Sequence, residues 1–156
     1  MLLIRKYGVI RMLEQKLMEE EITKGLANDE LIKEYKSFKI MKPKFIECSV
    51  EGSVTFSFPV LEWELNGYGT MQGGFIVAAF DNAFGILGFY MTGGALFTTI
   101  DITTSYQRPV FMGDELTVRV YIKSLGKNIV HMNGEAYNKE NKLVATSSTN
   151  IMKLQQ

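Results

Sequence analysis

The chain has 156 residues, enough for one domain with a sizeable core and too few for two comfortable ones. Its 17 basic and 17 acidic residues cancel and no long block of like charge occurs, so no nucleic-acid partner is expected. Cys48 is the only cysteine, which excludes an internal disulfide framework, disfavours a zinc site and favours a cytoplasmic location. The N-terminus lacks a signal-peptide pattern, and we predict no cofactor.

Helices are expected before the first strand. Apolar residues recur at near-helical spacing over residues 2–22, and the segment "NDELIKEYKSF" offers Asn28 as an N-cap followed by acidic residues. After Pro43 the sequence becomes rich in β-branched and aromatic residues, with Gly52 as a turn between two strands. We assign residues 1–42 to a helical extension and residues 43–156 to the main domain.

A long apolar helix is expected over about residues 73–91. Asp81 and Asn82 lie at its middle and Gly-Gly pairs flank it, which favours a core helix over a membrane span. Strands joined by short turns follow, at "SLGKN" and "NKENK", and "ELTVRVYIKS" alternates cleanly between apolar and polar residues. The order predicts an α+β fold, an antiparallel sheet with the hydrophobic helix along its face. Because that helix is apolar nearly all round, it needs cover on more than one side.

The start of this helix carries a candidate site. Gly73 and Gly74 lie in its first turn, where backbone N–H groups lack intrahelical partners and can hold an oxyanion. The preceding connection, "NGYGTMQ", contains Asn66 and Gln72, which can donate hydrogen bonds to a carbonyl oxygen.

The spacing between Gly73 and Asp81 predicts a dimer. Eight residues of helix separate two groups by roughly 12 Å, so one chain cannot use both on one bond. A second copy packed antiparallel across a two-fold axis would bring the carboxylate of one subunit opposite the helix end of the other. Two alternatives involve no catalysis. Gly73 and Gly74 would make only a tight turn, and Asp81 and Asn82 would form a hydrogen-bonded pair with a structural role.

The segments "NGYGTMQGGFIVAAFDNAFG", "TIDI", "YQRP" and "GDELTV" together resemble the hotdog-fold acyl-CoA thioesterases of the phenylacetate-pathway (PaaI-like) and thioesterase-superfamily-member-2 type. The resemblance covers about residues 45–153. It implies a sheet wrapped around the central helix, and a homodimer or a tetramer made of two dimers. It also implies acyl-CoA as the substrate.

The resemblance also implies residue roles. Asp81 would activate water or attack the thioester carbon, and the Gly73 N–H would polarise the thioester carbonyl. Asn66 would lie near the water or the carbonyl, and Thr99 would help to hold the water. Many relatives have histidine where this chain has Gln72, which can donate a hydrogen bond to a carbonyl but cannot deliver a proton at neutral pH.

Further substrate contacts are predicted at Gly74, Asn82 and Arg108, with no metal ligand. Burial of Asp81 between apolar helices should raise its pKa and make it a better base. The alternative functions are a non-catalytic module that binds acyl thioesters and a dehydratase or hydratase, which normally needs a histidine in the site.

Other candidates are interpreted as structural. The only histidine, His131, is expected on a partly exposed strand face, and Cys48 in the core. Asp101 is expected in a structural contact; Lys123 and Lys127 are weak candidates for contacts with phosphate.

Overall fold

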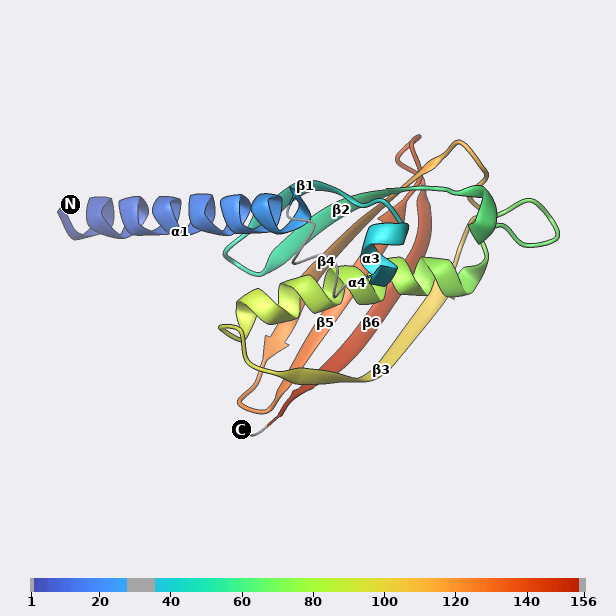
Figure 1. Ribbon diagram of the computed structural model, residues 1–156. Helices are drawn as coiled ribbons and strands as arrows, with labels where there is room; N and C mark the ends of the chain where they lie inside the picture. Colours follow the sequence, from blue (N-terminus) through green and yellow to red (C-terminus); the bar gives the residue numbers. More distant parts are fainter. Residues whose placement is uncertain (1, 28–35, 155–156) are drawn as a thin grey trace.

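The computed structural model describes residues 2–27 and 36–154, which form an α+β fold, as predicted (Figure 1). The elements are α1 Leu2–Ala27, α3 Lys36–Ile40, β1 Lys44–Ser49, β2 Ser53–Pro59, the 3-10 turn η1 Glu62–Glu64, α4 Gly73–Met91, β3 Phe97–Tyr106, β4 Glu115–Leu125, β5 Ile129–Tyr137 and β6 Leu143–Lys153.

The six strands form one antiparallel sheet in the order β1-β2-β4-β5-β6-β3. Helix α4 lies along one face of this sheet, which curves around it (Figure 1). This is the hotdog arrangement, so the predicted fold is confirmed. Strands β1 and β3 are the two edges of the sheet, and β3 has no strand on its outer side within the described chain.

The alternation in β4 positions the sheet against α4. Leu116, Val118 and Val120 are fully buried, as their period of two predicts. Ile122 is only partly buried, and the pairing with β5 shifts by a β-bulge just after it. Gly52 makes the predicted turn between β1 and β2 with a φ of 103°, a conformation that favours glycine.

Helix α4 has the predicted bounds, and one of its faces forms the centre of the core. The residues buried on this face are Ile76, Ala79, Phe80, Ala83, Phe84, Leu87 and Gly88. By length and composition α4 could also cross a membrane, but here it packs on the sheet as the predicted core helix.

Among residues 2–27 and 36–154, α3 covers only part of the opposite face of α4 (Figure 1). Asp81 lies on an uncovered part and is exposed in the single chain. The expected burial of Asp81 is therefore not met within one chain, because the sheet covers only one side of the helix.

The N-terminal helix is longer than expected, since α1 continues to Ala27 rather than ending near residue 22. Met18 and Ile22 join the core, and the Gln15 amide donates to the carbonyl oxygen of Cys48 in β1 at 2.6 Å. Asn28, the predicted N-cap of the second helix, lies outside the described residues. The boundary at residue 42 stays a prediction, although the N-terminal helices share the core of the sheet.

Candidate active site

The first turn of α4 leaves one backbone donor unused. Gln72 is the N-cap, and its Oε1 accepts a hydrogen bond from the Gly74 N–H at 2.7 Å. The Phe75 N–H donates to the Gln72 carbonyl oxygen at 2.9 Å. The Gly73 N–H has no hydrogen-bond partner among the described residues. It is therefore available to an acceptor at a helix end that favours negative charge.

Tyr106, the last residue of β3, covers Gly73. Its hydroxyl donates to the Gly73 carbonyl oxygen at 3.0 Å. A Cβ atom on residue 73 would lie 2.9 Å from the phenol ring, so a larger residue here would require the Tyr106 ring to shift. Beside them is a hollow of about 320 Å³, lined by Thr70, Met71, Gly73, Ile76, Tyr106, Gln107, Arg108 and Pro109.

Asn66 shapes the loop that leads to α4. Its Oδ1 accepts hydrogen bonds from the Tyr68 N–H at 2.9 Å and the Thr70 N–H at 3.2 Å. Its Nδ2 donates to the Thr70 hydroxyl at 2.9 Å. The bond from the Tyr68 N–H closes an Asx turn and the two bonds with Thr70 extend it, so the amide builds the loop. The predicted contact of Asn66 with water or the thioester stays a prediction.

The structure brings Thr99 to Asp81, across 18 residues of sequence. The Thr99 hydroxyl donates to Asp81 Oδ1 at 3.5 Å, a long hydrogen bond. Thr99 points toward α4 because it pairs with Ile151, which is buried on that face of the sheet, and a bulge follows Thr99 in β3. The two side chains that the family resemblance associates are thus neighbours.

The pKa of Asp81 is raised by burial, and the hydrogen bond from Thr99 opposes the shift. The direction matches the expectation, although the residue as a whole is exposed in the single chain. We attribute the shift to atoms of α4 and β3 that crowd one side of the carboxylate while the other side remains open. A second chain on the open side would remove more water and raise the pKa further.

The other predicted substrate contacts lie apart from Asp81 and Thr99. Asn82 is half-buried and donates to Met41 Sδ at 3.5 Å, toward α3. The Gly74 N–H is already bound by Gln72. Contacts of these residues with a substrate stay predictions.

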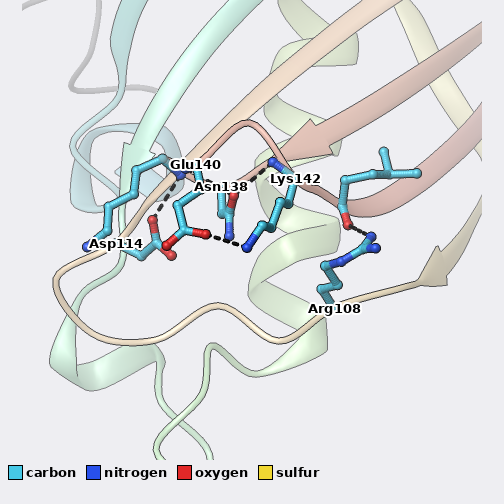
Figure 2. A network of polar contacts seen from close by, with 7 residues as sticks. Arg108, Asp114, Asn138, Glu140 and Lys142 are labelled. Carbon is cyan, nitrogen blue, oxygen red and sulfur yellow. Dashed lines mark hydrogen bonds and ion pairs between the residues drawn. The ribbon is translucent and has the colours of Figure 1, made fainter.

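Arg108 lies at the hollow beside Gly73. Its guanidinium donates to the Leu143 carbonyl oxygen at 2.8 Å, which ties the loop after β3 to the start of β6 (Figure 2). The neighbouring β5–β6 turn is held by its own polar network, in which Asn138 Oδ1 accepts from two backbone N–H groups and Lys142 pairs with Glu140 (Figure 2). Arg108 is exposed, so a role in binding anions stays a prediction.

The residues interpreted as structural have structural contacts. His131 is half-buried, and its Nδ1 lies 3.0 Å from Asn150 Oδ1. The Asn150 amide donates to the Asp101 carboxylate at 2.9 Å, which makes a row across β5, β6 and β3. Burial raises the pKa of the Cys48 thiol to about 11, so this thiol is inert. Within residues 2–27 and 36–154, no three His, Cys, Asp or Glu side chains could hold a metal ion together.

Two residues near the start of α4 have contacts or burial that the sequence did not predict. Tyr106 is the first residue of the "YQRP" segment, and the sequence assigned no role to its side chain. Glu64 is fully buried, its Oε2 accepts from the Leu61 N–H at 2.9 Å, and its Oε1 has no partner within the described part of the chain. Burial raises the pKa of Glu64 and the Leu61 hydrogen bond opposes the shift. The segment "LEWEL" alternates between apolar and acidic residues, as exposed segments do, so no feature of it predicts a buried carboxyl group.

The profile of the thioesterase superfamily matches residues 68–145. The chain belongs to the thioesterase superfamily. The matched region includes the first turn of α4, Asp81, Thr99 and Arg108. A comparison with curated proteins gives no match by sequence.

Solved structures with the same fold include a PaaI protein and two proteins described as thioesterases. The E. coli PaaI protein of the phenylacetic acid degradation operon is 22% identical, with a TM-score of 0.75 over 90% of this chain and 96% of that one. A putative thioesterase from Ralstonia eutropha, described as phenylacetic acid degradation-related, is 26% identical, with a TM-score of 0.68 over 73% and 86%. A hypothetical thioesterase from Streptococcus pneumoniae with coenzyme A is 19% identical, with a TM-score of 0.71 over 80% and 98%.

Proposed function

We propose that this thioesterase-superfamily protein is a cytoplasmic acyl-CoA thioesterase whose site is shared between two subunits. Asp81 is the general base or the nucleophile, and the Gly73 N–H of the other subunit is the oxyanion donor. The observation that carries the proposal is the contact between Asp81, on an uncovered part of α4, and Thr99 of β3, while the N–H at the start of the same helix has no partner among the described residues. A carboxylate and an oxyanion donor are the two groups that thioester hydrolysis requires.

The exposed edge of the sheet supports the dimer. Strand β3 is an edge strand and carries Thr99, whose neighbour Ile100 is 50% exposed. Exposed edges with apolar side chains tend to be covered by another chain. A second copy that meets β3 also places its own α4 near the first one. Such packing puts Asp81 of each chain opposite Gly73 of the other.

The chemistry consumes one water per thioester. With Asp81 as the general base, the carboxylate takes a proton from water, and the water oxygen attacks the thioester carbon. The negative charge on the carbonyl oxygen is held by the Gly73 N–H. The C–S bond then breaks, the departing sulfur takes the proton held by Asp81, and the free acid and the thiol of coenzyme A are released. With Asp81 as the nucleophile, an acyl-aspartyl anhydride forms first, and water hydrolyses it.

Coenzyme A as the carrier is supported by family membership and by a structural neighbour that contains coenzyme A. Arg108 lines the hollow beside Gly73, where the thioester would lie, and Gly74 follows in the same turn of α4. The acyl or aryl group is to be found with a panel of thioesters and a free-thiol assay. Hydrolysis of at least one member, lost in the Asp81→Ala variant, is expected. If the wild type hydrolyses none but binds them, the chain is a binding module and the proposal fails.

Mixing of two inactive variants tests whether the site is shared. Gly73→Ala and Asp81→Ala subunits, unfolded and refolded together, form mixed dimers in which one site keeps both native halves. Such a mixture should recover about a quarter of wild-type activity, because half of the dimers are mixed and each has one intact site. Each variant refolded alone is the control. Recovery to no more than the level of the controls would mean that the site is not shared between subunits.

A further inference from the structure

The peptide between Gly73 and Gly74 is held at both of its polar atoms. The Tyr106 hydroxyl donates to its carbonyl oxygen at 3.0 Å, and the Gln72 side chain accepts from its N–H at 2.7 Å. Two consecutive glycines restrict the backbone less than any other pair of residues. The rigidity of this turn therefore depends on the two side chains that hold the peptide.

The contact made by Tyr106 comes from a distant part of the chain. Tyr106 is 53% exposed, yet its hydroxyl turns back to a backbone carbonyl 33 residues away in sequence. The ring also leaves no room for a Cβ atom on residue 73. Both the hydroxyl and the ring thus act on the same glycine.

Strand β3 reaches both halves of the proposed site. Thr99, near its beginning, donates to Asp81, and Tyr106, at its end, donates to Gly73. The neighbouring peptide is the one whose N–H we assign to the oxyanion. Because successive peptides share the Cα atom of Gly73, fixing one peptide limits the rotation of the other.

We propose that Tyr106 is a positioning residue, which fixes the Gly73–Gly74 peptide so that the Gly73 N–H points at the thioester oxygen. This inference rests on the proposed function. An oxyanion donor acts mainly in the transition state, since it must lie at the position that the charged oxygen will occupy. Loss of the Tyr106 hydroxyl therefore lowers kcat and leaves KM nearly unchanged.

The decisive comparison is between Tyr106→Phe and Tyr137→Phe. Tyr137 is a matched control because its hydroxyl also makes one hydrogen bond, to Glu135 Oε2 at 2.8 Å, at the end of β5 away from α4. We expect Tyr106→Phe to lower kcat about tenfold with KM within about twofold, as for a weakened oxyanion donor. Tyr137→Phe should change neither constant, and both variants should unfold at the wild-type midpoint. Equal kinetic constants for Tyr106→Phe and wild type would overturn the inference.

Amide hydrogen exchange separates this inference from the proposed function. In Tyr106→Phe, the Gly74 amide should exchange several times faster than in the wild type, whereas amides of β5 should not change. If the wild-type protein hydrolyses no thioester, the proposed function fails and the exchange rates alone decide whether Tyr106 holds the peptide. Unchanged exchange at Gly74 would overturn the role of Tyr106 in either case.

Discussion

The first turn of α4 and its middle differ in how far one chain completes them. At the first turn, Gln72 and Tyr106 hold the Gly73–Gly74 peptide, and only the Gly73 N–H stays unused. At the middle, Asp81 has one long hydrogen bond and an open side. The first turn of α4 is thus preorganised within one chain, whereas the surroundings of Asp81 are completed only when a second subunit covers its open side.

The oxyanion donor and the carboxylate therefore owe their chemical properties to different parts of the structure. The oxyanion donor depends on local geometry, which neighbouring residues and one distant tyrosine supply. The carboxylate depends on its solvation, which a second subunit would change. Substitutions at the two places should therefore differ in their effects on activity, on pH dependence and on stability.

The largest effect is expected for Asp81→Asn, which keeps the shape of the side chain and removes the charge. The turnover of the best thioester should fall by about a thousandfold, as for loss of a general base. The pKa of Asp81 is raised in the folded state. The free energy of unfolding therefore falls as the pH rises from the ordinary carboxyl pKa through the folded pKa, because the folded chain must ionise this carboxyl group. At neutral pH, urea unfolding should thus show the Asp81→Asn variant to be at least as stable as the wild type.

Asp101→Asn is the matched control for this prediction. Asp101 lies in β3, but its carboxylate contacts Asn150 rather than α4, so turnover should be unchanged. Retention of a tenth or more of the wild-type activity by Asp81→Asn would remove the carboxylate from the mechanism.

Gly73→Ala should have the next largest effect, a loss of about a hundredfold in kcat, typical of a displaced oxyanion donor. The new Cβ atom would lie 2.9 Å from the Tyr106 ring, so the ring or the helix start must move. Gly25→Ala in α1 is the control, since a Cβ atom there meets nothing within 4 Å. Steady-state kinetics that show both variants to be fully active would mean that the first turn takes no part in the reaction.

Thr99→Ala should lower activity by up to about tenfold on the acid limb of the pH profile, an effect mainly on the protonation of Asp81. The Thr99 hydrogen bond lowers the pKa of Asp81, so its loss raises that pKa and shifts the acid limb of kcat/KM to higher pH. The defect should therefore shrink as the pH rises. Thr103→Ala, in the same strand with no hydrogen bond from its side chain, should keep the wild-type profile. An acid limb that stays in place would contradict the role of Thr99.

The smallest effect is expected for Glu64→Gln, next to the first turn. Burial raises the pKa of Glu64 in the folded state. Glu64 therefore favours folding most below the ordinary carboxyl pKa, and this stabilisation is lost as the pH rises through the folded pKa. At pH 8 the Gln variant should be more stable by about 1 kcal/mol, the lower range for an unsatisfied buried group. The gain should vanish near pH 4. Urea unfolding at both values, with the exposed Glu62→Gln as the control, checks this.

Local patterns in the sequence determined most of the fold. The apolar run between two glycine pairs predicted the bounds of α4. Alternation predicted the buried face of β4, because period and burial are linked within a single strand. Turn residues predicted the hairpins on either side of β5. The family motifs pointed to Gly73, Asp81 and Thr99 as site candidates before any distance was known.

Only the tertiary structure decided which of these candidates meet. The register of β3 on β6, with its bulge after Thr99, brings Thr99 to Asp81 and Tyr106 to Gly73. The same fold leaves Asp81 open and buries Glu64, because the sheet covers one side of α4 and the loop before α4 folds back over its first turn. Pairing and solvent exposure arise between segments far apart in sequence, so no local pattern of residues carries them.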